Sequence, residues 1–192
     1  MPKYFEFEVS LRDIKPRIWR RFLLATSATF SDLHDAIQAS FGWGGYHLWD
    51  FRGPKRLDPV LAAPGPDELD FHDPDEVEEP DADLVALASF FTAGRKVERC
   101  VYRYDFGDDW QHDVKRVAVR TEEASFERRL LAGELAGPPE DCGGQPGYDR
   151  LVEIFETGRD PWEEDASVLA EWLGDWRPDG FELATVKAHF DR

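Results

Sequence analysis

The chain has 192 residues and a formal net charge of −17, from 40 Asp and Glu against 23 Lys and Arg. Phosphate contacts require clustered cations, so this balance argues against nonspecific nucleic-acid binding as the main function. Two cysteines are too few for a disulfide scaffold, and no apolar run reaches the length of a membrane helix, so we expect a single cytoplasmic domain over residues 1–192.

The N-terminal residues predict a strand hairpin followed by a helix. Apolar and polar residues alternate over residues 4–11, a period-two pattern that is typical of a half-buried strand. A turn at 13–16 and a second strand at 18–24 are expected next. Ser31 is suited to cap a helix whose apolar residues share one face, and Gly42 is suited to end it.

Five cations gather around this first hairpin, within 56 residues that carry nine Lys and Arg against six Asp and Glu. They are Arg12, Lys15, Arg17, Arg20 and Arg21. One interpretation is a local contact with a nucleic acid, for which clustered cations are required. The other, which we favour, is a set of solvated charges that discourage association between strand edges.

The next segment contains a short strand and an acidic insertion. The strand is predicted at 47–52. Residues 53–83 are rich in proline and hold ten acidic residues between Asp67 and Asp83, so we expect a mobile insertion without regular structure. A short helix at 84–91 is expected to follow.

The stretch 102–112 combines aromatic side chains, carboxylates, a glycine and an imidazole more densely than any other part of the chain. Before Gly107 the aromatic residues fall on one side of a period-two pattern, and the alternation resumes after Asp109. The pattern predicts a hairpin with its tip at 107–109. A register slip is expected near residues 115–116, where the alternation breaks.

The C-terminal third is predicted to be mostly helical. One or two helical turns are expected at 128–135 and a longer helix at 148–155. Residues 137–147 lie between them and are rich in glycine and proline, so they are expected to be irregular.

Two pairs of acidic residues have the spacing of capping boxes for two further helices. They are Asp160 with Glu163 and Asp179 with Glu182. The order of all these elements indicates an α+β fold, in which a mostly antiparallel sheet of about five strands carries helices on one face.

Six short motifs stand out along the chain: IWRR at 18–21, DLHDAIQ at 32–38, FGW at 41–43, YDFGDDWQH at 104–112, PPEDCGG at 138–144 and WLG at 172–174. In this combination they resemble the plasmid pRiA4b ORF-3-like family, some members of which are labelled resolvase-like passenger proteins of insertion elements. The resemblance implies a compact α+β domain and an association with mobile elements, but no established reaction.

Two positions depart from the pattern of that family. Its members often have a second histidine where this chain has Trp49, and a cysteine where it has Gly137. A metal site that uses either ligand is therefore weakened here. The resolvase label finds no support in the residues either, because no serine or tyrosine lies in the arginine-rich setting that recombinase chemistry requires.

A candidate functional cluster lies in and near the 102–112 stretch. It contains Asp105, Asp108, Asp109, Trp110, His112, Glu140 and Asp141. The candidate metal ligands are Asp105, Asp108, Asp109, His112 and His47. Clustered carboxylates with an imidazole could hold a divalent cation that activates water, as in a hydrolase or nuclease.

Structural roles compete with this interpretation at each position. Asp105 and His112 could form a charged pair across the strands of the hairpin, which we favour over a metal site. Glu140 and Asp141 could accept backbone N–H bonds and brace the glycine-rich loop against the hairpin. Trp110 could line a ligand groove or belong to the core.

Two functions therefore stay open for the chain. The first, which we favour, is a non-catalytic module that binds a protein or nucleic-acid partner through its sheet. The second is a divalent-metal-dependent hydrolase or nuclease that uses the 105–112 turn. The thiol of Cys142 lies beside two acids, which raise a thiol pKa, so a nucleophilic role for it is not expected.

Overall fold

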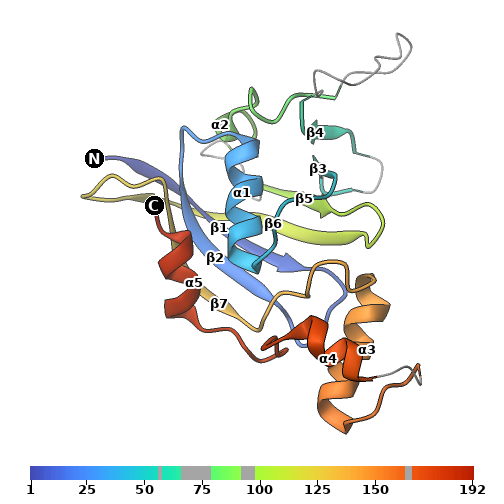
Figure 1. Ribbon diagram of the computed structural model, residues 1–192. Coiled ribbons are helices and arrows are strands. Elements are labelled where there is room, and N and C mark those ends of the chain that lie inside the picture. Colours follow the sequence, from blue (N-terminus) through green and yellow to red (C-terminus); the bar gives the residue numbers. More distant parts are fainter. Residues whose placement is uncertain (56–57, 66–78, 92–97, 163–165) are drawn as a thin grey trace.

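The computed structural model describes residues 1–55, 58–65, 79–91, 98–162 and 166–192 (Figure 1). Among these residues, seven strands form one antiparallel sheet in the order β4-β3-β5-β6-β1-β2-β7. The strands are β1 (Lys3–Leu11), β2 (Trp19–Ala25), β3 (Trp49–Arg52), β4 (Val60–Ala62), β5 (Glu98–Tyr104), β6 (Trp110–Thr121) and β7 (Arg128–Glu134). The α+β class is confirmed, whereas the expected count of about five strands is wrong.

The two strands that the sequence patterns missed lie at the two edges of the sheet. β4 falls inside the 53–83 segment, where it pairs with β3, and a bridge joins Ala63 to Asp81. The expectation that this whole segment lacks regular structure is therefore wrong. Residues 66–78, which hold most of its acidic run, lie outside the described part of the chain.

β7 occupies the residues that were expected to form helical turns. Its side chains alternate in burial, with Arg128 and Leu130 inside. Residues such as Leu131 and Ala132 favour helices in isolation. The adjacent edge of β2, however, presents N–H and C=O groups that pair with this segment, and that pairing overrides the local preference.

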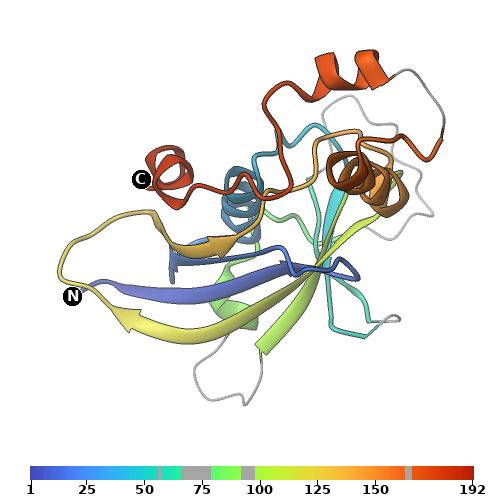
Figure 2. The ribbon, with the colours of Figure 1, turned by 90° about the horizontal axis from the view of Figure 1, so that it is seen from below.

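Five helices accompany the sheet among the described residues: α1 (Phe30–Phe41), α2 (Leu87–Phe90), α3 (Gly144–Thr157), α4 (Ala166–Leu173) and α5 (Leu183–Phe190). α1 and α5 contact each other and lie on the same face of the sheet (Figure 2). None of the described helices is both long enough and apolar enough to cross a membrane.

The start of α1 differs from the expected cap. Thr29, rather than Ser31, is the N-cap residue, and its hydroxyl accepts the Asp32 N–H at 3.3 Å. The Asp32 carboxylate accepts the Thr29 N–H at 2.8 Å in return, which completes a capping box. Gly42 ends the helix in the left-handed conformation, as expected, with φ of 83°.

The N-terminal caps predicted for the last two helices also differ from the structure. α5 has Glu182 at its N-cap position and no side-chain cap, so the predicted box with Asp179 is absent there. Glu163 lies outside the described residues. Its expected partner Asp160 accepts hydrogen bonds from Arg150 Nε at 2.9 Å and from the Trp162 N–H at 3.0 Å.

The two faces of the sheet differ in chemistry. Phe5, Phe7 and Val9 of β1 are buried in one core cluster with Leu33 and Ile37 of α1. The opposite face carries ion pairs instead. Arg120 Nε lies 2.6 Å from the buried Glu6, and Arg17 Nη2 lies 2.6 Å from Glu8.

The central hairpin predicted at 102–112 is confirmed as β5 and β6. Tyr104 pairs with Trp110 and Tyr102 pairs with His112. The register slip expected near residues 115–116 also occurs, since the pairing with β1 skips Val117. A bulge at this position keeps Val114 on the core side while the strand continues.

Candidate functional site

Asp105 directly follows β5 and shapes the tip of the central hairpin. Its backbone is left-handed, with φ of 53°, a conformation that aspartate tolerates better than most residues. One carboxylate oxygen, Oδ1, accepts the Gly107 N–H at 2.9 Å and the Asp108 N–H at 3.2 Å. The other oxygen, Oδ2, points to His47 at 3.7 Å. Asp105 therefore closes the turn and also faces the next side chain of the site.

The 137–147 segment folds onto this hairpin tip, and its last residues are helical because α3 begins at Gly144. Asp108 Oδ2 accepts the Gly143 N–H at 3.1 Å. A Cβ at Gly144 would lie 2.7 Å from the Asp108 carbonyl oxygen, so glycine is needed for this close approach. The prediction that the segment is irregular throughout is thus wrong for residues 144–147.

Glu140 ties the same segment to the connection between α1 and β3. Its Oε1 accepts the Gly44 N–H at 2.7 Å and the Tyr104 hydroxyl at 3.0 Å. Burial, followed by the Glu140 carboxylate, raises the pKa of Tyr104 well above its ordinary range, so this phenol stays a donor. The second oxygen of Glu140 lies 3.9 Å from His47 Nε2.

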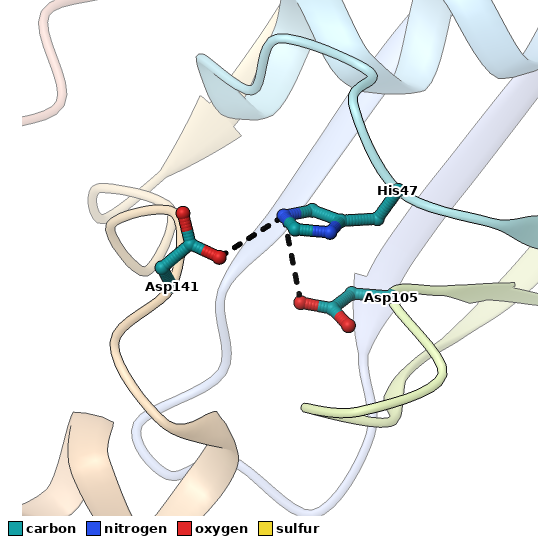
Figure 3. A group of neighbouring side chains, drawn as sticks. All are labelled: His47, Asp105 and Asp141. Atoms are coloured by element: carbon teal, nitrogen blue, oxygen red, sulfur yellow. Dashed lines mark ion pairs between the residues drawn. The ribbon is translucent and has the colours of Figure 1, made fainter.

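His47 lies where these segments converge, between Asp105 and Asp141 (Figure 3). Its Nε2 is 3.1 Å from Asp141 Oδ1. The three residues each offer one ligand atom, and these atoms lie within 4.8 Å of one another. The Asp141 oxygen is near enough to His47 Nε2 for a hydrogen bond, but no contact of this nitrogen with the described residues has hydrogen-bond geometry. The position in the ring plane where a partner of Nε2 would lie is therefore not filled by any of them.

The cluster concentrates negative charge around one imidazole. Asp105, Glu140 and Asp141 supply three carboxyl groups, and a positive charge among them is stabilised electrostatically. A divalent cation bound to all of them would supply that charge. The backbone of Asp141 is left-handed, with φ of 55°. Its side chain is 70% exposed, so the cluster is open to solvent on this side.

The structure brings together four of the residues singled out by sequence: His47, Asp105, Glu140 and Asp141. Asp108 and Asp109 do not join them. Asp108 supports the start of α3, and Asp109 is exposed and accepts a hydrogen bond from Gln111 Nε2 at 2.9 Å. Trp110 is buried beside Trp43, in keeping with the core interpretation.

His112 is part of the core and not of the site. It is fully buried beside Phe41, Trp43 and Tyr102, and neither ring nitrogen has a hydrogen-bond partner among the described residues. Burial lowers the pKa of His112 to about 3, so its ring is neutral. The favoured pairing of Asp105 with His112 is wrong, because His112 pairs across the ladder with Tyr102 while Asp105 faces His47.

Tyr104 and Gly44 are the site residues that sequence reasoning missed. Both hold Glu140 in place, one through a phenol and one through a backbone N–H. Tyr104 shares a side of the alternating pattern with buried aromatic residues, so the pattern alone assigns it to the core. A backbone donor such as Gly44 leaves no signal in the residue type at all.

The basic group at the first hairpin is largely neutralised by internal contacts. Arg17 and Arg21 pair with Glu8, and Arg12 pairs with Asp113 at 2.6 Å. Arg20 is buried. Its guanidinium donates to the carbonyl oxygens of Ser40, Trp19, Glu134 and Leu135 at 2.7, 2.8, 3.0 and 2.8 Å. A nucleic acid could not reach Arg20, so the five residues do not form one exposed basic surface.

Comparison with known proteins relates both sequence and fold to earlier examples. The profile of the family described as "Plasmid pRiA4b ORF-3-like protein" matches residues 3–185. "Uncharacterized protein y4hQ" of Sinorhizobium fredii is 34% identical over 173 residues, which cover 87% of this chain and 79% of that protein. The crystal structure of a protein of unknown function, MM3350 from Methanosarcina mazei Go1, is similar with a TM-score of 0.76 and 31% identity over 96% of both chains.

Proposed function

This chain belongs to the plasmid pRiA4b ORF-3-like family, and we propose that it acts through a divalent cation held by His47, Asp105 and Asp141 in a hydrolytic reaction. The observation that carries the proposal is the convergence of these three ligand atoms from three separate segments. An imidazole and two carboxylates supply the ligands, and Glu140 is near enough to provide a further oxygen.

The separations within the cluster suit a common bound ion. Ligands about 2.1 Å from a tetrahedral ion lie about 3.4 Å from one another. His47 Nε2 is 3.1 Å from Asp141 Oδ1 and 3.7 Å from Asp105 Oδ2, which brackets that value. Small side-chain rotations would therefore suffice for coordination.

The donor set narrows the identity of the ion. Imidazole nitrogen favours zinc, iron and nickel over magnesium and calcium, while carboxylate oxygen also suits manganese. The only described thiol nearby, Cys142, has its pKa raised to about 12, chiefly by burial, and it is not among the ligand atoms. Zn²⁺ and Mn²⁺ are thus the ions that this set fits best.

The surrounding residues support water activation. A bound divalent cation lowers the pKa of a coordinated water toward neutrality and so supplies a nucleophile. Glu140 Oε1 accepts bonds from Gly44 and Tyr104, while its Oε2 lies 3.3 Å from the Tyr104 hydroxyl and 3.9 Å from His47 Nε2, where it could accept a proton. The exposed side of Asp141 leaves room for an ester or phosphoester substrate.

Calorimetric titration of Zn²⁺ and Mn²⁺ tests the site directly. We expect saturable binding of one ion, and at least about a tenfold loss of affinity in Asp141→Asn, since one charged ligand is removed. Asp109→Asn is the matched control, because it removes the charge of an exposed carboxylate at the hairpin tip, close to the cluster but outside it, and should bind normally. Absence of binding, or equal loss in both variants, would overturn the proposal.

A binding module for a protein partner is the second candidate. Trp162 and Trp172 are 52% and 48% exposed, and exposed tryptophans are frequent anchors of protein interfaces. This candidate gains if no divalent ion binds while the tryptophan pair, changed to serine, loses association with a partner that the wild-type protein retains. A nucleic-acid partner at the first hairpin is the weaker form of this candidate, because most of the basic side chains there already have carboxylate or carbonyl partners.

We also propose that the protein is a single cytoplasmic domain associated with mobile elements. Both cysteines, Cys100 and Cys142, are free thiols, which is usual in a reducing compartment. The association with mobile elements rests on the family alone, whose description refers to a plasmid. Location can be tested by fractionating cells that express the tagged protein.

A further inference from the structure

A second concave site lies on the charged face of the sheet, away from the core side that carries the His47 cluster. Its volume is about 520 Å³, which is within the usual range for a small-molecule pocket. The lining residues are Arg12, Arg52, Gly53, Pro54, Lys55, Val101, Arg103, Asp109 and Gln111. Four cations against one lining carboxylate is unusual for a chain with a net charge of −17.

Strand pairing explains why these cations meet. Asp50 of β3 pairs with Arg103 of β5, and Arg103 pairs with Gln111 of β6. Arg12 follows β1, and its N–H donates to the Gln111 carbonyl at 2.8 Å. Residues paired across four neighbouring strands, β3, β5, β6 and β1, thus place these side chains next to one another on one face of the sheet. The loop after β3 adds Lys55 as a wall.

Asp50 holds two of the guanidinium groups in position. Its carboxylate is 1% exposed and accepts hydrogen bonds from Arg52 Nε and Nη2 at 3.0 and 2.9 Å, and from Arg103 Nη2 at 2.7 Å. Arg103 also lies 3.9 Å over the ring of Phe106. Two guanidinium groups that share one buried carboxylate keep an excess positive charge and unused donors, in an arrangement fixed before any ligand arrives.

The remaining charges of the pocket do not cancel this excess. Arg12 is matched by Asp113 at 2.6 Å, and Asp109 offsets Lys55 in number. When the lining residues are counted with the carboxylates that pair with their side chains, one positive charge remains; Asp58, which accepts the Lys55 N–H, and Glu79, which acts on Arg52 electrostatically, lie outside the lining. The fork of guanidinium donors matches the oxygens of a phosphate group better than a point charge would.

We propose that this pocket binds the phosphate group of a small phosphate monoester. Arg52 and Arg103 contact the phosphate oxygens, and Lys55 supplies the further positive charge. The open volume beyond the guanidinium groups receives the rest of the ligand. The site is independent of the proposed cation cluster, since none of the cluster residues lines it.

Calorimetric titrations with inorganic phosphate, adenosine monophosphate and adenosine, all in EDTA and at equal ionic strength, test the proposal. We expect the first two to bind and adenosine not to bind. Arg103→Gln and Lys55→Gln should each lower the affinity for adenosine monophosphate by about tenfold, as expected for loss of one charged contact. Arg99→Gln, an exposed arginine of the same strand outside the pocket, is the matched control and should bind normally.

Asp50→Asn separates a positioned site from simple charge attraction. It adds positive charge to the pocket but releases the two guanidinium groups, so we expect weaker binding, provided that thermal unfolding shows a folded protein. Equal loss in Arg99→Gln, or binding of adenosine alone, would overturn the proposal. A single-stranded oligonucleotide that binds far more tightly than the monophosphate would assign the face to nucleic acid instead. Asp141→Asn changes the proposed cation cluster and not the pocket. Unchanged affinity of this variant for adenosine monophosphate would show that the phosphate pocket does not depend on the cation cluster.

Discussion

The hydroxyl of Tyr104 donates a hydrogen bond to Glu140 at 3.0 Å and so joins the last residue of β5 to the loop that precedes α3. The two residues come from segments with unrelated sequence patterns, an alternating strand and a glycine-rich loop. Together with the bond from the Gly143 N–H to Asp108, this contact fixes how far the loop, and therefore Asp141, lies from the hairpin tip.

We expect Tyr104→Phe to lower the free energy of unfolding by about 1–2 kcal/mol, because it leaves a half-buried carboxylate with one donor fewer. Affinity for Zn²⁺ should also fall severalfold, since Glu140 is then held by Gly44 alone. Urea denaturation and calorimetry measure the two effects. Tyr46→Phe is the control, because Tyr46 lies near Gly44 in the connection between α1 and β3 and its side chain is exposed. Unchanged stability and ion affinity in Tyr104→Phe would refute the bracing role.

Local patterns in the sequence were enough to predict the elements that nearest neighbours determine. The period-two alternation around 102–112 predicted the β5–β6 hairpin, and its break predicted the bulge at Val117. Gly42 likewise ended α1 where the helical face ran out. These features depend on residues within a few positions of one another, so the chain itself carries the signal.

Elements that depend on distant partners were not predictable in the same way. β7 forms because β2 has an open edge, which no pattern within β7 records. The site residues His47 and Asp141 were both singled out, but their meeting was not, because it requires the loop before α3 to fold back on the hairpin. The pairing of Asp105 with His112 failed for the opposite reason, since sequence proximity across a turn does not tell which way each side chain points.

Asp108 is expected to be structural. Asp108→Ala removes the acceptor of the Gly143 N–H at the start of α3, so we expect a loss of about 1 kcal/mol in the free energy of unfolding. Its affinity for Zn²⁺ should change far less than that of Asp141→Asn. Glu123→Ala, an exposed carboxylate elsewhere, serves as control for the loss of charge. If Asp108→Ala abolished ion binding while stability stayed normal, Asp108 would have to be counted as a ligand.

Stability should fall in mild acid because two buried histidines are neutral in the folded protein. Burial lowers the pKa of His34 to about 4 and that of His112 to about 3, whereas the unfolded chain has ordinary values near 6.5. Between about pH 6.5 and pH 4 the unfolded state therefore binds more protons, and the free energy of unfolding falls by up to about 1.4 kcal/mol per pH unit for each histidine.

His112→Phe should remove its share of this acid sensitivity. Phenylalanine keeps the ring contacts with Phe41 and Trp43 and eliminates two ring nitrogens that have no protein partner among the described residues. Urea denaturation as a function of pH measures the slope, and His189→Gln, an exposed histidine, should leave it unchanged. An identical slope for wild type and His112→Phe would show that His112 is already protonated or solvated in the folded state.

Arg20 should prove to be a core residue and not a ligand contact. Its guanidinium donates to four backbone carbonyls, at the C-terminal end of α1 and along the ends of β2 and β7, and it lies 4.8 and 4.1 Å from the rings of Phe41 and Phe181. Arg20→Lys provides one compact ammonium that cannot span these acceptors, so we expect a loss of about 2–4 kcal/mol in the free energy of unfolding. Arg17→Lys changes an exposed arginine of the same hairpin and should stay within about 0.5 kcal/mol of wild type. The difference in stability between the two variants is measured from the midpoints of urea denaturation, provided that the m-values are unchanged. Equal effects of the two substitutions would mean that Arg20 is solvated after all, and the basic first hairpin would again be a candidate surface for nucleic acid.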